Sequence, residues 1–341
     1  MALRVALLGG GFMGRMHAAA YSYLDDVELV ALACKEPRAS EEYEVFRGLR
    51  VYDDGEQMME QERLDLVDIC LPTFLHAEWA IKAAKRGLHV LSEKPMALKV
   101  EDADRIIETV EQAGVKFMVA HCIRFWKEYL YLRDVVESGE LGVLKSIKMW
   151  RAGAAPLWSW DGWLLDKDRS GSMMIDMMIH DVDFLQVIAG KPLEVHALGF
   201  RKDALWIHAN VLLRFRNELS AFLEGSWALP ESRSFKFGFL AVFENGVVEY
   251  DVTGDPALTV YQGKEVTHPV MDVPELPKTD LGGNVTLMPC YLDEISYFLE
   301  CIREDREPDR VPAKESRDAL AIALAMVDSA QTGKTLDIPV D

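Results

Sequence analysis

The chain has 341 residues, half of them hydrophobic, and a formal net charge of −19. This length predicts two domains. The acidic balance argues against nucleic acid or an anionic membrane surface as a partner, since both attract basic patches. No apolar stretch reaches the roughly 20 residues of a membrane-spanning helix, and we expect no signal peptide. The five scattered cysteines lack C-x-x-C spacing, so we expect a reduced, cytoplasmic chain without a metal site.

A short apolar run near the amino terminus enters three consecutive glycines, and a helix-competent stretch follows. Gly9, Gly11 and Gly14 have the G-x-G-x-x-G spacing of a dinucleotide-binding loop. Glycine there permits the tight turn, the approach of a pyrophosphate and close packing of helix on strand, while the helix start attracts the anion. We expect this loop, with Phe12 and Met13, to bind the cofactor. An ordinary glycine-rich turn is the alternative.

Short apolar runs then alternate with helical patterns as far as residue 120. Strands alternating with helices predict βαβ units and a parallel, doubly wound sheet. We therefore predict a Rossmann domain over residues 1–122. Ligands of such folds bind at the carboxyl ends of the strands, so the residues that follow each strand are the candidates for a site.

The second strand ends at Cys34, where an enzyme that uses NAD usually has an acidic residue for the ribose 2′-hydroxyl. Lys35 follows and Arg38 is close, and positive charge suits the 2′-phosphate of NADP. We expect NADP or NAD as cofactor, with NADP favoured. Glu36 could substitute for the missing carboxylate, and the two cations could instead be solvated loop charges.

Thr73 and His76 follow the fourth strand, and Glu93 and Lys94 follow the fifth. We expect all four to contribute to cofactor binding. Thr73 has the alternative role of capping the next helix. Lys94 is either a structural partner of Glu93 or a functional cation, and its bond to Pro95 is a candidate for the cis isomer.

Residues 123–341 are predicted to form a second α/β domain for substrate binding and oligomerisation. From residue 193 the chain has strand-length apolar runs separated by turns, which predicts an open, mainly antiparallel sheet. Both faces of this sheet carry apolar residues. Since an apolar face left in water marks an interface, we expect a homodimer or a homotetramer.

Two features of the second domain are candidates for chemistry. Three tryptophans within residues 158–163 could line a sugar-sized pocket or anchor the core. Asp176 and His180 have i, i+4 spacing, which places them on one face of a mostly buried helix over residues 170–184. They are a core pair, two metal ligands without an evident third, or a catalytic pair; Asp183 lies near the same face.

The pattern resembles the glucose–fructose oxidoreductase, inositol dehydrogenase and MocA (Gfo/Idh/MocA) family of nicotinamide-dependent oxidoreductases. The resemblance covers nearly the whole chain and is carried by four segments, namely the glycine loop, Glu93-Lys94-Pro95, His121 to Phe125, and Gly171 to Asp183. It implies a Rossmann domain and an open-sheet domain with the substrate over the nicotinamide. It also maps the family's lysine, aspartate and histidine to Lys94, Asp176 and His180.

The chain departs from the family pattern at three places. Ser172 replaces a glycine, a change that we expect to matter little. Met178 also replaces a glycine and is expected to reshape the pocket. Cys34 replaces the acidic residue and puts the preference for NAD in doubt.

Oxidation of a secondary alcohol needs a base with a pKa near 7, which His180 provides. Lys94 is expected to stabilise the alkoxide, Asp176 to bind a hydroxyl, and Arg124 and Trp163 to contact the substrate. The expected substrate is a sugar, polyol or inositol. An NAD-retaining glycosidase, a non-catalytic dinucleotide sensor and a carbonyl or imine reductase are the alternatives.

Overall fold

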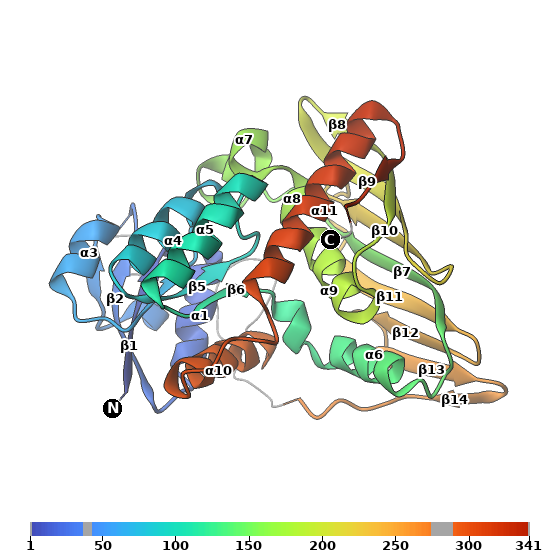
Figure 1. The fold of residues 1–341 in the computed structure, drawn as a ribbon, viewed down its shortest axis with the longest axis horizontal. Coiled ribbons are helices and arrows are strands. Elements are labelled where there is room, and N and C mark those ends of the chain that lie inside the picture. The colour runs from blue at the N-terminus through green and yellow to red at the C-terminus, as the bar shows by residue number, and fades with distance from the viewer. Residues whose placement is uncertain (1, 37–42, 274–288, 340–341) are drawn as a thin grey trace. The chain divides into compact units, whose positions relative to one another are not determined.

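The computed structural model describes residues 2–36, 43–273 and 289–339 (Figure 1). These residues divide into two compact units. One contains the described residues of 1–125 and 274–317, and the other contains those of 126–273 and 318–341. Each unit has its own sheet.

The first unit has a six-stranded sheet in the order β3-β2-β1-β4-β5-β6, and every neighbouring pair is parallel. This is the predicted doubly wound Rossmann sheet. Its strands are β1 Leu3–Leu8, β2 Val27–Ala33, β3 Arg50–Tyr52, β4 Leu66–Ile69, β5 His89–Glu93 and β6 Phe117–Ala120. Its helices are α1 Phe12–Tyr21, η1 Glu44–Phe46, α3 Gly55–Gln61, η2 Thr73–Leu75, α4 His76–Lys85, α5 Val100–Ala113, η3 Cys122–Phe125 and α10 Pro289–Arg303.

Helix α5 illustrates how the sequence builds this layer. Its buried residues Ala103, Ile106 and Val110 recur at helical spacing, and Gly114 ends it in a left-handed conformation. Figure 1 shows α5 beside α4, and the two helices pack together. Helix α10 packs against α1. Residues 289–317 therefore belong with the first unit. The domain boundary that we predict from the sequence, at residue 122, places them in the second domain.

The second unit has a nine-stranded sheet in the order β14-β13-β12-β11-β7-β10-β9-β8-β15. It is mainly antiparallel, as predicted, and its one parallel pair joins β7 and β10. Its strands are β7 Leu144–Ala152, β8 Glu194–Lys202, β9 Leu205–Arg214, β10 Ser220–Ser226, β11 Lys236–Phe243, β12 Val247–Asp251, β13 Leu258–Gln262, β14 Glu265–Thr267 and β15 Leu336–Asp337. Its helices are α6 Lys127–Ser138, η4 Trp160–Leu165, α7 Lys167–Ser170, α8 Met173–Asp176 and α9 Ile179–Ala189, while α11, Ala313–Thr332, starts in the first unit and continues in the second.

Helices α6 and α9 pack together and cover one face of this sheet (Figure 1). Tyr129 of α6 lies at the centre of the core, with ring centroids 4.9 Å from Phe184 of α9 and 5.2 Å from Phe239 of β11. On the other face, Leu212 and Phe222 are exposed and are direct cross-strand partners in β9 and β10. The expectation that both faces carry apolar side chains is confirmed for these strands.

One expected element is wrong. The sequence predicts a single helix over residues 170–184, but this stretch contains two separate helices, α8 and α9, with Met177 and Met178 between them. The N–H of Met178 donates to the carbonyl of Met173, five residues earlier, whereas an α-helix pairs residues four apart. The regular α-helical hydrogen-bond pattern is therefore interrupted at this point. Asp176 ends the first helix and His180 lies in the first turn of the second.

Candidate active site

The glycine loop fits a pyrophosphate. A Cβ atom on Gly9 would lie 2.4 Å from the carbonyl oxygen of Cys70, and one on Gly14 would lie 2.0 Å from that of Gly9. Side chains are therefore excluded where helix and strand meet. A Cβ on Gly11 would meet no atom within 4 Å, so the loop is open on that side. This combination of close packing and an open face is what a dinucleotide-binding loop requires.

The start of α1 supports the same interpretation. Gly11 is its N-cap and provides no side-chain hydrogen bond to the first N–H groups of the helix. Phe12 and Met13 form the first turn and are half-buried. Backbone donors at a helix start favour an anion. The residues present therefore fit the phosphates of a dinucleotide.

The strand register brings the candidate residues of the first unit to one edge of the sheet. Leu8 pairs with Ala33 and with Ile69, and Ile69 pairs with Ser92. The carboxyl ends of β1, β2, β4 and β5 are therefore level. The residues that directly follow them are Gly9, Cys34, Cys70 and Lys94.

Cys34 lies beside the glycine loop. A Cβ on Gly10 would be 3.6 Å from the Cys34 Sγ atom. Lys35 and Glu36 are exposed, and Arg38 lies outside the described residues. Arg15, which the sequence reasoning did not single out, places its guanidinium 4.3 Å from the Tyr43 ring centroid and one NH group 3.5 Å from the Gly10 carbonyl oxygen.

Thr73 does not cap the helix that follows it. Pro72 is the N-cap of η2, and no side-chain capping bond is present. The Thr73 side chain is buried, and its hydroxyl has no hydrogen-bond partner within the described structure. A buried hydroxyl without a partner is costly unless a ligand satisfies it. This favours the expectation that Thr73 faces the cofactor.

His76 is buried between two backbone carbonyls. Its Nδ1 lies 2.7 Å from the oxygen of Pro95 and its Nε2 lies 2.8 Å from that of Leu71. Burial lowers the pKa of His76 despite these carbonyls, so the neutral ring donates to one of them at a time. The ring thus links the end of β4 to the cis peptide bond between Lys94 and Pro95.

Glu93 and Lys94 adjoin a buried polar cluster that the sequence reasoning missed. The peptide N–H of Lys94 donates to Glu93 Oε2 at 3.1 Å. Glu93 Oε1 lies 3.2 Å from His17 Nε2, and His17 Nδ1 lies 2.8 Å from Asp68 Oδ2. The hydroxyl of Tyr21 donates to the same Asp68 oxygen at 3.0 Å. Two sequence signals were available: a carboxylate within the apolar run of β4, and a histidine within the alanine-rich α1.

The protonation of this cluster follows from its charges. Burial opposes ionisation of His17, but the Asp68 carboxylate raises the pKa of His17 well above its ordinary value. Burial would raise the pKa of Glu93, but the hydrogen bond and the charge of His17 bring that pKa below its ordinary value. An imidazolium between two carboxylates results.

Asp68, His17 and Cys70 also place potential metal-ligating atoms within 4.8 Å of one another. Metal-bound cysteine is a thiolate. Burial, followed by the charge of Asp68, raises the pKa of Cys70 far above the ordinary thiol value, and the thiol donates to Asp68 at 3.6 Å. Through these contacts Asp68 links His17, Tyr21 and Cys70 in one hydrogen-bonded network.

In the second unit, Ser172 and Met178 occupy unusual positions. Ser172 has φ 90° and ψ 174°, a conformation that almost only glycine adopts, and its buried hydroxyl has no partner among the described residues. The expectation that this substitution matters little is therefore wrong, because the backbone is strained. Met178 is fully buried, and its Sδ would lie 2.6 Å from a Cβ on Gly225 of β10. The missing side chain of Gly225 makes room for Met178.

His180 is followed by a buried ion pair that sequence reasoning also missed. Arg151 of β7 donates from Nε to Asp181 Oδ1 at 2.9 Å, and a second guanidinium nitrogen donates to the hydroxyl of Tyr129 at 3.3 Å. This pair attaches the start of α9 to the sheet and thereby positions His180. Asp183 is fully buried one turn beyond His180.

The two expected substrate contacts have different surroundings. Arg124 is buried, and its guanidinium donates to Glu315 at 2.6 Å and to the carbonyl of Arg310 at 2.9 Å. Trp163 is half-buried in η4. Its neighbours Trp158 and Trp160 are 51% and 44% exposed, so the interpretation of these two as core anchors is wrong.

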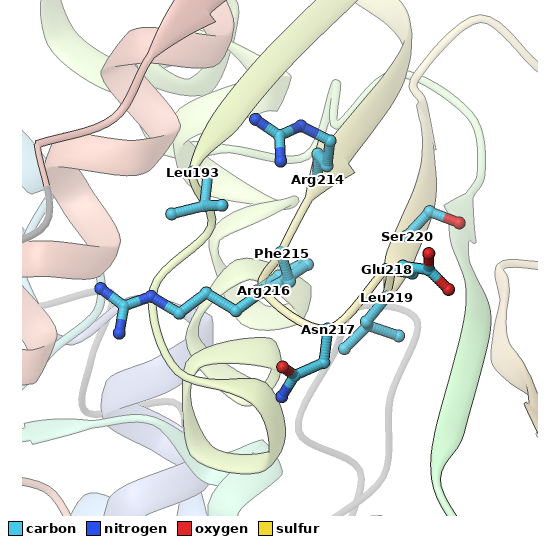
Figure 2. A pocket seen from close by; sticks show the side chains of 8 residues that line it. All are labelled: Leu193, Arg214, Phe215, Arg216, Asn217, Glu218, Leu219 and Ser220. Atoms are coloured by element: carbon cyan, nitrogen blue, oxygen red, sulfur yellow. The ribbon is translucent and has the colours of Figure 1, made fainter.

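A pocket of about 740 Å³ lies at the turn between β9 and β10 (Figure 2). Figure 2 shows Arg216 and Asn217 at the turn. None of the expected site residues lines this pocket, and the candidate chemistry lies elsewhere.

Comparisons with known proteins identify both parts of the chain. The family model described as an oxidoreductase family with an NAD-binding Rossmann fold matches residues 3–121, and the GFO/IDH/MocA C-terminal domain matches residues 129–249. Myo-inositol 2-dehydrogenase of Thermotoga maritima is 32% identical to this chain over 56% of the chain. The match spans little more than half, 56%, of that relative's own length. D-xylose 1-dehydrogenase (NADP(+)) 2 of Haloferax volcanii is 27% identical over 91% of this chain and 92% of its own. The crystal structure of myo-inositol 2-dehydrogenase from Lactobacillus plantarum has the same fold, with a TM-score of 0.83 at 22% identity, covering 99% of this chain and 100% of that one.

Proposed function

Because the chain belongs to the Gfo/Idh/MocA family of oxidoreductases, we propose that it transfers hydride between NAD(P) and a secondary alcohol or carbonyl group of a sugar, polyol or inositol-like substrate. The observation that carries this proposal is the level edge of the first sheet, where Lys94 follows β5 at the same edge at which β1 enters the open glycine loop. The names of the inositol and xylose dehydrogenases above support the substrate class.

The chain's own residues would manage the proton and the developing charge. A bound nicotinamide supplies the hydride acceptor. In this proposal His180 accepts the hydroxyl proton, since an imidazole titrates near neutrality. The ammonium group of Lys94 stabilises the developing alkoxide, and Asp176 accepts a hydrogen bond from a substrate hydroxyl.

The indole-rich segment favours a ring-shaped substrate. The faces of sugars carry C–H groups that pack on aromatic rings. Trp158 and Trp160 expose half or nearly half of their surface, and Arg169 holds the segment through a 3.0 Å contact with the Asp161 carboxylate. We include Trp163 of the same segment among the substrate contacts.

For the cofactor we propose that NADP is accepted at least as well as NAD. Cys34, at the end of β2, provides no carboxylate for a ribose 2′-hydroxyl, and Lys35 is exposed directly after it. A cation at this place favours a 2′-phosphate.

We further propose a homodimer or homotetramer formed through the open face of the second sheet. Leu198, Phe200, Leu212 and Phe222 are each at least 36% exposed on β8, β9 and β10. Contiguous exposed apolar side chains mark an interface. A monomer in light scattering at micromolar protein would contradict this assembly.

The function is tested by assaying sugars, polyols and inositols with NAD and with NADP, following absorbance at 340 nm. Reduction of either cofactor by at least one of these compounds is expected. Glycoside cleavage with a retained cofactor and no net NADH would instead identify a glycosidase. Cofactor binding without turnover across the panel would favour a sensor.

A further inference from the structure

The Asp68–His17–Glu93 network is costly for a purely structural feature. All three side chains are buried, His17 and Asp68 completely and Glu93 at 6% exposure. Buried ion networks are often no more stabilising than apolar residues of similar volume, because desolvation offsets the attraction. The position of the network therefore calls for a functional explanation, and the residue that follows it is Lys94.

The network reaches Lys94 through a continuous series of contacts. Asp68 fixes one ring nitrogen of His17 at 2.8 Å, and the other ring nitrogen lies 3.2 Å from Glu93 Oε1. The second oxygen of Glu93 accepts the Lys94 peptide N–H at 3.1 Å. Each carboxylate thus has a defined orientation. One oxygen of the Glu93 carboxylate contacts the His17 ring, and the other accepts the hydrogen bond from the Lys94 backbone.

We propose that His17 is a positioning residue for Lys94: held between Asp68 and Glu93, it orients the Glu93 carboxylate toward the Lys94 peptide and compensates its negative charge. This inference rests on the proposed function in one respect, that Lys94 acts on the substrate. The effect of His17 on the electrostatic environment of Lys94 can be measured in the absence of substrate.

Other ionisable groups also face the network. Cys70 follows β4 beside Asp68, Tyr21 lies on the same helix as His17, and His76 contributes to the potential at Glu93. From α10, the ring centroid of Tyr291 lies 6.3 Å from that of His17, and burial raises the pKa of Glu294 well above its ordinary value. Among the described residues, Asp68, His17 and Glu93 are the charged groups of this network.

Two substitutions should change the environment of Lys94 in opposite directions. His17→Gln removes the one cation between the two carboxylates, so the charge near Lys94 becomes more negative and Lys94 holds its proton to higher pH. Glu93→Gln keeps an acceptor for the Lys94 peptide but removes the negative charge, so Lys94 loses its proton at lower pH. Tyr21→Phe is the matched control, because it deletes a hydrogen bond to Asp68 and keeps all three charges.

The experiment measures the rate of Lys94 acylation by acetic anhydride against pH, by peptide mass spectrometry of the full chain, with exposed Lys85 as internal reference. The midpoint for Lys94 should rise by about half a pH unit or more in His17→Gln and fall by a similar amount in Glu93→Gln, while Tyr21→Phe matches the wild type. Midpoints that do not move, or that move in the same direction, would overturn the proposal. If circular dichroism shows that one variant is unfolded, the direction in which the Lys94 midpoint moves in the other variant tests the proposal.

Failure of the proposed function gives a different result. Opposite shifts at Lys94 in a protein without turnover on the substrate panel would uphold the positioning role and reject hydride transfer. With a substrate, Glu93→Gln should lower kcat by about tenfold or more and change the cofactor Kd by less than about threefold. Normal kcat in Glu93→Gln would contradict the positioning role.

Discussion

The Nδ1 atom of His76 lies 2.7 Å from the carbonyl oxygen of Pro95, the residue that follows Lys94. His76→Leu would leave one buried carbonyl without its donor, at a cost of about 1–3 kcal/mol. Because that carbonyl adjoins Lys94, we expect kcat to fall by about tenfold and the NADH Kd to change little. His76→Gln keeps a donor and should recover part of the rate. A large rise in Kd would show that His76 contacts the cofactor directly.

Ser172→Gly should stabilise the protein. At φ 90° and ψ 174°, serine is strained by about 1–3 kcal/mol, which exceeds the entropic cost of glycine of about 0.5–1 kcal/mol. The measurement is the thermal midpoint of unfolding. Ser172→Ala is the matched control, since it removes the unpartnered hydroxyl and keeps the strain. Equal gains for the two variants would assign the cost to the hydroxyl instead of the backbone.

The stability of the protein should depend on Asp181 between about pH 4 and pH 6. Burial raises the pKa of Asp181 from 3.8 to about 6, with Arg151 acting in the opposite direction. The folded protein therefore holds this proton to higher pH than the unfolded chain. The associated stability, on the order of 3 kcal/mol, is present at acid pH and is lost as pH rises through this window.

Urea unfolding at half-unit steps of pH checks this dependence. Asp181→Asn should remove the downward slope that Asp181 contributes. Asp168→Asn, which changes an exposed carboxylate on α7, should keep the slope of the wild type. An unchanged slope in Asp181→Asn would mean that Asp181 stays ionised over the whole range.

Lys35→Ala should weaken NADPH binding by about tenfold, the loss expected for one charged hydrogen bond, and should hardly change NADH binding. Fluorescence titration with both cofactors measures the difference, and Lys85→Ala, an exposed lysine on α4, is the control. Equal weakening of both cofactors would show that Lys35 does not contact the phosphate.

The fold was predictable from the sequence because its signals are local. Apolar strands alternating with helical patterns predicted the parallel sheet, and the glycine spacing predicted the loop at its edge. The interruption between Asp176 and His180 was not predictable, since Met173 to Met178 are all compatible with an uninterrupted helix. It depends on the slipped hydrogen bond to Met173 and on the space beside Gly225, a residue of a distant strand.

The candidate site was predictable only at strand ends and known motifs. The partners of His17 are 51 and 76 residues away in the sequence, so spacing alone does not reveal them. The strain at Ser172 was also hidden, because it is a property of the backbone conformation and not of composition. In contrast, the exposure of Trp158 and Trp160 contradicted a composition-based expectation that indoles are buried.

The most direct test of the central claim is the steady-state rate of His180→Ala and Lys94→Ala, measured beside cofactor binding by fluorescence titration. If His180 is the proton acceptor, its loss lowers kcat by roughly 10²–10⁴ while the cofactor Kd stays nearly unchanged. Lys94→Ala should lower kcat at least as much, because its ammonium group stabilises the alkoxide. Near-normal turnover in His180→Ala, with a substrate that the wild type oxidises, would contradict the account.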